Sequence, residues 1–293
     1  MRRTGFLYTR NMTIDIKAWL DKARLSLVRH ENPGIEGLVL VEWATGLSRA
    51  AILTHPERIL TTKEIQTLDN ALGRLNSGEP LPYIIGSWEF YGLRFEVTPQ
   101  VLIPRPETEM LVELGLEWLR MHPNRRNAAD VGTGSACIAC ALAHHVHDLH
   151  VLAVDQSTTA LKIAARNIKR LEVSQMVSLV ASDLLTAIQG PLDLIAANLP
   201  YIPTGKLVSL AVSDHEPRSA LDGGTDGLTL ISHLLSDSPR WLAPGGLVLL
   251  EIEADQGESV PQLARELVTD ARVDMIRDLA GKPRAVRIEI MAY

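Results

Sequence analysis

The chain has 293 residues, 46% of them hydrophobic and 22% charged, a composition typical of a globular protein with a full apolar core. Its formal charge of −6 provides no global attraction to nucleic acid or to anionic membranes. No apolar run approaches the roughly 18 residues of a membrane-spanning helix, and the basic start MRRTGFLYTRNM has too short an apolar island for a signal peptide. We therefore expect a cytoplasmic protein without a membrane segment.

The first part of the chain is predicted to be helical. Three segments repeat apolar residues at three- and four-residue spacing: TIDIKAWLDKARLSLVRH, IEGLVLVEWATGL and TTKEIQTLDNALGRLNSG. Thr61 or Thr62, followed by Glu64, is typical of a helix start. We expect residues 1–12 to be disordered and residues 13–80 to form a helical bundle. Because the bundle has no polar constellation of its own, its expected role is to hold a partner.

A β-hairpin is predicted next. GSWEFYGLRFEVT has two short aromatic and β-branched runs around Tyr91-Gly92. This hairpin lies in residues 81–100, the expected linker to a second domain at 101–293. The first helix of that domain is predicted to open with Pro106, with Glu107 and Glu109 in its first turn, residues that suit a helix N-terminus.

The second domain alternates strands and helices. Strands are predicted at 128–131, 150–155, 177–181, 192–197 and 246–252. Helical segments such as TTALKIAARNIKRL and DGLTLISHLLSDSPRWL lie between them. Only the turn Gly281-Lys282-Pro283 separates the last two strands, so the terminal strand should be antiparallel in an otherwise parallel sheet. The predicted fold class is therefore α/β.

The stretch DVGTGSACIACALA places a strand end, a glycine loop and a helix start in succession. Gly132 and Gly134 let the backbone turn tightly and approach a ligand at the helix N-terminus. Nicotinamide enzymes use the same geometry, and glycines also serve plain turns. Two later strand ends add specificity, because Asp155 can accept ribose hydroxyl hydrogens and Ser182-Asp183-Leu184 can contact an adenine edge.

Cysteine and histidine residues suggest no metal site. Cys137 and Cys140 form C-x-x-C inside a small-residue helix, and no second cysteine pair completes a zinc site. The histidines of AHHVHDLH close the same helix, where they are favourable in themselves. We expect neither a metal nor a Ser-His-Asp triad.

In the stretch DLIAANLPYIP, a buried strand ends at Asn198. Asparagine carries both an acceptor and donors, and the carboxyl ends of strands in open α/β sheets are where ligands bind. The simpler interpretation is a strand terminated by Pro200 with a capping asparagine.

Six separate motifs, in order along the chain, point to one family. They are YIIGSWEFYGLRFEV, VLIPRPETEMLVE, DVGTGSACIA, ANLPYIP, EPRSALDGGTDGL and DLAGKPRAVRIEI. Together they resemble the PrmC/HemK family of class I S-adenosylmethionine-dependent methyltransferases, the protein-(glutamine-N5) methyltransferases of peptide chain release factors. The resemblance runs from residue 13 or so to the end. It implies a Rossmann-like domain with a seven-stranded, mostly parallel sheet and one antiparallel strand, preceded by a partner-binding helical domain.

The same resemblance implies an activity: methyl transfer from S-adenosyl-L-methionine to the glutamine of the Gly-Gly-Gln loop in class I release factors, with S-adenosyl-L-homocysteine as product. Asn198 and the carbonyl of Leu199 would accept the two amide hydrogens, and Pro200 and Tyr201 would complete the catalytic and substrate-binding motif, with Tyr201 packed on the flat amide. The residues that would hold the cofactor are Gly132, Thr133, Gly134, Ser135, Ala136, Asp155, Asp183, Leu184 and Asn198.

The chain departs from the family pattern at three positions. Leu199 replaces a proline, so the loop should be looser or carry an extra N–H donor. Ala136 replaces a third glycine, which is tolerable if its φ is negative. Leu184 stands where an aromatic residue is common, so cofactor affinity should be reduced. EPRSALDGGTDGL, with its turn at Asp222-Gly223-Gly224, lies near the substrate entrance or is simply an exposed loop.

Three alternatives remain open. A glutamine methyltransferase of a ribosomal protein shares the catalytic motif. A DNA adenine-N6 methyltransferase faces the same delocalised nitrogen, but it must flip a base and grip phosphates, and this acidic chain has no basic recognition domain. A non-catalytic cofactor-binding protein is the third, with Leu199 as a sign of decay. The joint presence of Asp155, Asp183, Asn198 and Tyr201 argues against it.

Overall fold

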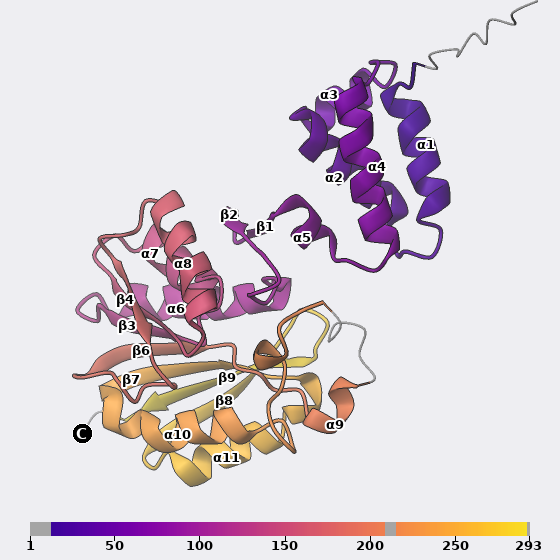
Figure 1. The fold of residues 1–293 in the computed structure, drawn as a ribbon. Coiled ribbons are helices and arrows are strands. Elements are labelled where there is room, and N and C mark those ends of the chain that lie inside the picture. Colours follow the sequence, from indigo (N-terminus) through magenta and orange to yellow (C-terminus); the bar gives the residue numbers. More distant parts are fainter. Residues whose placement is uncertain (1–12, 209–214, 292–293) are drawn as a thin grey trace, which may run out of the picture. The chain divides into compact units, whose positions relative to one another are not determined.

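The computed structural model describes residues 13–208 and 215–291, so the disorder expected for residues 1–12 lies outside the described part. Contacts divide the chain into two compact units, Met1–Ile85 and Gly86–Tyr293, and each is described by itself (Figure 1).

The first unit is helical. Its helices are α1 (Ile16–Ser26), α2 (Pro33–Thr45), α3 (Arg49–Thr54), α4 (Thr62–Asn76) and α5 (Leu81–Ile85). The predicted start of α4 is confirmed as a capping box, because Thr61 Oγ1 accepts the N–H of Glu64 at 3.2 Å and the Glu64 carboxylate accepts the N–H of Thr61 at 2.7 Å. Trp19 and Leu68 are fully buried in the shared core of these helices.

The second unit begins with the predicted hairpin, formed by β1 (Ser87–Phe90) and β2 (Leu93–Glu96). Tyr91 and Gly92 both have positive φ, +51° and +70°, as a two-residue hairpin turn requires. Phe90 and Phe95 project from the hairpin into the core of the unit.

A seven-stranded sheet forms the centre of this unit. Its strands are β3 (Asn127–Val131), β4 (His150–Asp155), β5 (Val177–Ala181), β6 (Leu192–Ala197), β7 (Leu242–Glu251), β8 (Ala271–Arg277) and β9 (Pro283–Ile290), in the order β5-β4-β3-β6-β7-β9-β8. β9 is antiparallel to both β7 and β8, whereas the other pairs are parallel. This confirms the predicted topology, although β7 begins at Leu242 rather than at residue 246.

Helices cover both faces of the sheet (Figure 1). On one face lie α6 (Glu109–Met121), which follows the short helix η1 (Pro106–Thr108), α7 (Cys137–His145) and α8 (Thr158–Arg170). On the other lie α10 (Thr229–Trp241) and α11 (Ser259–Leu267). The shorter elements are α9 (Thr204–Leu207), η3 (Arg218–Ala220) and η4 (Ala254–Gln256). Within the described ranges, no helix has the length and apolar character needed to cross a bilayer.

The strand order creates a switch point between β3 and β6. From β3 the chain proceeds to β4 and β5 on one side, and β6 then lies on the opposite side of β3. Connections therefore leave the carboxyl ends of β3 and β6 in opposite directions, which opens a crevice where ligands bind in such sheets.

Candidate active site

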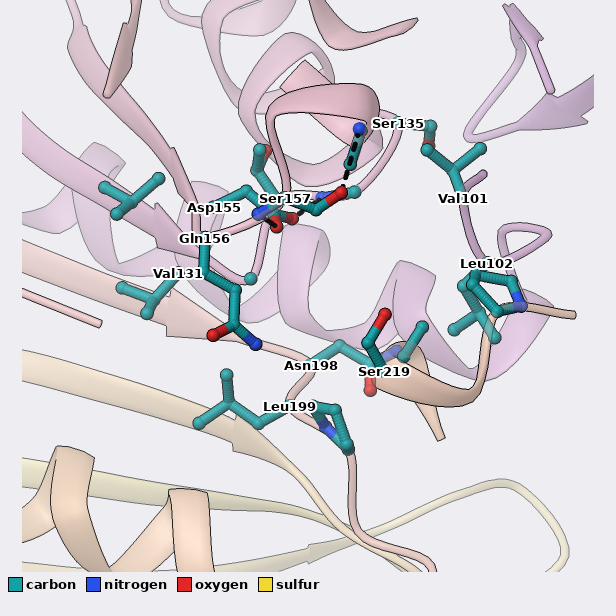
Figure 2. Close-up of a pocket in the computed structure, with 18 of the residues that line it drawn as sticks. Val101, Leu102, Val131, Ser135, Asp155, Gln156, Ser157, Asn198, Leu199 and Ser219 are labelled. Atoms are coloured by element: carbon teal, nitrogen blue, oxygen red, sulfur yellow. Dashed lines mark hydrogen bonds between the residues drawn. The ribbon is translucent and has the colours of Figure 1, made fainter. Parts of the chain in front are cut away.

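A cavity of about 300 Å³ opens at the carboxyl ends of β3, β4, β5 and β6 (Figure 2). Its other walls come from residues of the segments 100–105 and 217–220. The sequence-predicted residues that line it are Gly132, Thr133, Gly134, Ser135, Asp155, Asp183, Leu184, Asn198, Leu199 and Pro200. Ala136 and Tyr201 are not among the described residues that line the cavity.

Glycine conformations shape the loop after β3. Gly132 and Gly134 have φ of +75° and +54°, a region that glycine enters without steric cost. A Cβ on Gly132 would lie 3.1 Å from Cδ2 of Leu199. The loop after β3 and the loop after β6 are therefore packed closely against each other.

Asp130 ties the glycine loop to α7, a role that the sequence did not single out. Its Oδ2 accepts the hydroxyl of Thr133 at 2.5 Å and the N–H of Ala139 at 3.0 Å. Burial raises the pKa of Asp130 to about 6, although both hydrogen bonds lower it. The sequence signal that could have identified it is its position two residues before Gly132, the first glycine of the loop.

Ala136 requires a correction, because its φ is +63° rather than negative. The chain enters the left-handed region there to begin α7, and the Ala136 carbonyl accepts the N–H of Cys140 at 2.9 Å. For a residue with a Cβ, this left-handed conformation raises the free energy of the folded state by roughly 1–2 kcal/mol. Alanine in place of glycine at position 136 therefore lowers the stability of the fold. The Ala136 side chain is fully buried in the core beside the loop, so it supports the loop and does not line the cavity.

The carboxylate of Asp155 lies at the end of β4, on the cavity wall. Its Oδ2 accepts the N–H of Gly134 at 2.9 Å, and its Oδ1 accepts the N–H of Ser157 at 2.8 Å. Burial raises the pKa of Asp155, and these two hydrogen bonds oppose the rise. Each oxygen has a second lone pair, so the group can still accept from two neighbouring hydroxyls. Figure 2 shows Gln156 extending into the cavity, a carboxamide that the sequence did not single out.

The loop after β5 closes the cavity on the side of Ser182, Asp183 and Leu184. Ser182 is buried and its hydroxyl oxygen accepts the N–H of Ala187 at 3.1 Å, which holds the loop in place. Leu184 has a φ of +46°. The loop therefore offers one exposed carboxylate and one apolar side chain to a ligand.

Asn198 follows β6 and is partly buried on the cavity wall. Its Nδ2 donates a hydrogen bond to Oγ1 of Thr108 across 3.0 Å. Among the described residues, no hydrogen bond engages its Oδ1. The acceptor end of this carboxamide is therefore available to a ligand.

Leu199 is only 3% exposed and belongs to the apolar cluster beneath the sheet. Its contact with Gly132 fixes the loop by side-chain packing, where a proline ring would restrict φ instead. Whether the loop is looser than one with proline, as expected from the sequence, stays a prediction.

Tyr201 points away from the cavity. Its Oη lies 3.5 Å from Oε1 of Glu251, and burial followed by the nearby charge of Glu251 raises its pKa. Its backbone carbonyl accepts from Nε2 of Gln256 at 3.3 Å. Through these contacts with Glu251 and Gln256, Tyr201 fixes the loop after β6. Its expected packing on a substrate amide stays a prediction.

Glu251 is buried at the end of β7 and was not predicted from the sequence. Burial raises its pKa to about 7, while a side-chain hydrogen bond from Thr108 lowers it. Thr108 is 2% exposed and contacts both this carboxyl and Asn198. No local pattern pairs these positions, because they are far apart along the chain.

The segment EPRSALDGGTDGL packs against the loop after β6. Gly223 donates its N–H to the carbonyl of Ile202 at 2.9 Å, and a Cβ on Gly223 would lie 2.7 Å from the carbonyl oxygen of Pro200. Glu216 is buried, pairs with Arg105, and accepts the N–H of Ile103 at 3.3 Å. The segment therefore forms one wall of the cavity and braces the loop that carries Asn198, which is more than an exposed loop would do.

The two cysteines are buried, unpaired thiols in α7. Cys137 lines the cavity, and burial raises its pKa to about 12, which keeps the thiol protonated at neutral pH. Across residues 13–208 and 215–291, no cluster of three or more metal-ligating side chains is present.

Comparisons with known proteins place this geometry in context. Residues 18–86 match the model of the PrmC N-terminal domain, and residues 108–215 match the methyltransferase small domain. A release factor glutamine methyltransferase from Moorella thermoacetica is 41% identical over 264 residues, which cover 89% of this chain and 93% of that protein. One from Nitratidesulfovibrio vulgaris is 38% identical over 270 residues, covering 90% and 91%.

Among solved structures, a methyltransferase from Pyrococcus furiosus superimposes with a TM-score of 0.52 at 21% identity. The match covers 77% of this chain and 100% of that one. This likeness supports the fold, and the sequence relatives carry the family assignment.

Proposed function

The chain belongs to the family of release factor glutamine methyltransferases, and on that premise we propose that it methylates N5 of the glutamine in the Gly-Gly-Gln loop of class I release factors, with S-adenosyl-L-methionine as methyl donor. The observation that carries the proposal is the free acceptor end of Asn198, on the wall of a cavity that the glycine loop and Asp155 also line.

The chemistry of a glutamine amide explains the need for such an acceptor. The amide nitrogen is a poor nucleophile because its lone pair is delocalised into the carbonyl. Oδ1 of Asn198 and the carbonyl of Leu199 would accept its two hydrogens and aim the nitrogen at the methyl group. The N–CH₃ bond forms as the S–CH₃ bond breaks, its electron pair stays on sulfur, and the nitrogen then loses one proton to water. The protein contributes mainly alignment and oriented dipoles.

The cavity fits the methyl donor on two observations. Gly132 and Gly134 form a cradle of positive φ, and a Cβ on Gly132 would lie only 3.1 Å from Cδ2 of Leu199, so a side chain there would be both strained and crowded. Asp155 has free lone pairs for a vicinal diol at the adjacent strand end. When bound there, the sulfonium of S-adenosyl-L-methionine supplies an activated methyl group. Asp183 and Leu184 would contact the adenine, while Thr133, Ser135 and Ala136 shape the loop.

The helical unit is proposed to bind the release factor. Residues 18–86 match the PrmC N-terminal domain, and among the described residues of this unit five large apolar side chains are exposed: Leu25, Val28, Ile35, Leu53 and Ile59. Exposed apolar side chains of this kind suit contact with a protein partner. Such a substrate implies action in the cytoplasm, where translation terminates.

Labelling with a methyl-tritiated donor tests the proposal. The protein is incubated with an unmodified class I release factor, and mass spectrometry locates the label. We expect one labelled glutamine, and we expect Asn198→Ala to abolish labelling while cofactor binding, measured by calorimetry, survives. Asn124→Ala, which removes an exposed carboxamide in the loop before β3, is the matched control. Label on a ribosomal protein or on duplex DNA instead, or on nothing, would refute the proposal.

A further inference from the structure

Two buried polar side chains lie behind Asn198. Thr108 ends η1 and Glu251 ends β7, and they are 2% and 4% exposed. The sheet register pairs Ala197 with Leu250, so Glu251 lies on the strand next to position 198. The Asn198 carboxamide, the Thr108 hydroxyl and the Glu251 carboxyl group therefore lie close together, although they come from three separate elements.

The hydrogen bonds among these groups have a direction. Nδ2 of Asn198 donates to Oγ1 of Thr108 across 3.0 Å, so the hydroxyl oxygen is the acceptor there. The hydroxyl proton must then go to another acceptor, and the Glu251 carboxyl stands at the end of the adjoining strand, where Thr108 also acts to lower its pKa. Glu251 has acceptor capacity to spare, because its Oε2 is buried without a close donor in the described part of the chain. An ionised carboxylate can only accept.

We propose that Thr108 and Glu251 are positioning residues that decide which end of the Asn198 carboxamide faces the substrate. The inference rests on the proposed function, in which the oxygen must face the glutamine amide. With its proton given to Glu251, Thr108 offers Asn198 only a lone pair. That turns Nδ2 toward Thr108 and Oδ1 toward the cavity. A carboxamide turned end for end would present N–H groups to the N–H groups of the substrate and repel them.

Variants of Thr108 test the inference, assayed well above the Glu251 pKa of about 7. Thr108→Val removes the hydroxyl with little change in shape, and we expect kcat to fall by about tenfold or more while the cofactor Kd changes by less than about threefold. Thr108→Ser keeps the hydroxyl and should restore most of kcat. Ser238→Ala, which removes a fully buried hydroxyl in α10, is the control for deleting one such group.

Variants of Glu251 provide a second test of the inference that does not depend on the Thr108 variants. Glu251→Met removes the acceptor, so Thr108 can donate to Oδ1 of Asn198 and favour the reversed carboxamide; kcat should fall as in Thr108→Val. Glu251→Gln keeps a carbonyl acceptor and should retain most of kcat. Because both residues act through one carboxamide, the double variant of Thr108→Val and Glu251→Met should be no slower than the slower single variant.

The results that overturn the inference are specific. They are wild-type kcat in Thr108→Val, a Thr108→Ser variant as slow as Thr108→Val, or fully additive losses in the double variant. Thermal unfolding shows whether each variant is folded. If Thr108→Val does not fold, the comparison of Glu251→Met with Glu251→Gln tests the inference by itself. Failure of the proposed function gives a different result, because the wild-type protein itself would then label no release factor. In that case the inference is refuted together with the proposed function.

Discussion

The buried carboxyl of Glu251 leads to a quantitative prediction about stability and pH. Burial raises its pKa from 4.5 to about 7, and the charge of Glu107 adds to the rise. The hydrogen bond from Thr108, the charge of Arg284 and the hydrogen bond from Tyr201 act in the opposite direction. Between pH 4.5 and about 7 the folded protein therefore binds more protons here than the unfolded chain does. The contribution of this carboxyl to stability is present below pH 4.5 and is lost as the pH rises toward 7.

Glu251→Gln removes this ionisation. The interval from 4.5 to about 7, at about 1.36 kcal/mol for each pH unit, amounts to about 3 kcal/mol. We therefore expect the free energy of unfolding of the variant, taken relative to wild type, to be about 3 kcal/mol larger near pH 8.5 than at pH 4.5, which means a relatively more stable variant at the higher pH. Other groups with shifted pKa values, such as Asp130, titrate in both proteins and cancel in this difference.

Urea unfolding at the two pH values, followed by tryptophan fluorescence, measures the difference, since three of the five tryptophans, Trp88, Trp118 and Trp241, lie in the second unit. Glu117→Gln, the same change on the exposed side of α6, is the control for replacing a glutamate by glutamine. A difference below about 1 kcal/mol for Glu251→Gln would refute the reasoning, because the carboxyl would then be as well solvated in the folded state as in the unfolded chain.

Two further predictions concern the backbone. In Gly223→Ala the added Cβ would lie 2.7 Å from the carbonyl oxygen of Pro200 and 2.8 Å from Cα of Tyr201, so we expect the labelling rate to fall far more than cofactor affinity. Gly73→Ala in α4, where nothing lies within 4 Å, should change neither, and equal losses of rate and affinity in Gly223→Ala would contradict the prediction. Ala136→Gly relieves the φ of +63° and should raise the free energy of unfolding by about 1 kcal/mol, or Tm by about 2–4 °C, in a thermal scan; a lower Tm would contradict it.

Elements with a strong local signal were predictable from the sequence. The parallel strands are short apolar runs, and the two faces of β6 show why: Leu194 packs in one core cluster and Ile195 in the other, so the strand has no polar side. The capping box at Thr61 and the turn at Tyr91 were likewise predictable, because each depends on adjacent residues. Helices α3 and α5 were missed, since six and five residues are too few to show a helical period.

The site was predictable only where the ligand-facing groups follow a strand directly. Asp155 and Asn198 each come just after or at the end of a strand, and the carboxyl ends of parallel strands share one edge of a sheet. The support behind Asn198 comes from Thr108 and Glu251, which only the tertiary structure brings together. The φ of Ala136 was predicted with the wrong sign, because alanine itself carries no signal for a left-handed residue and only the glycine of the family pattern at this position points to one.

The sheet itself explains why a leucine at position 199 is compatible with an aligned site. Methyl transfer requires the nitrogen and the methyl carbon to meet at about 3–3.5 Å in the correct direction, so the glycine loop and Asn198 must hold a fixed separation. Val131 and Ala197 are paired in register, and the chain leaves β3 and β6 side by side at Gly132 and Asn198. Leu199 then fills the space above Gly132, 3.1 Å from where a Cβ would be. The separation is thus set by strand register and by this contact, and the rigidity of a proline ring is not needed to maintain it.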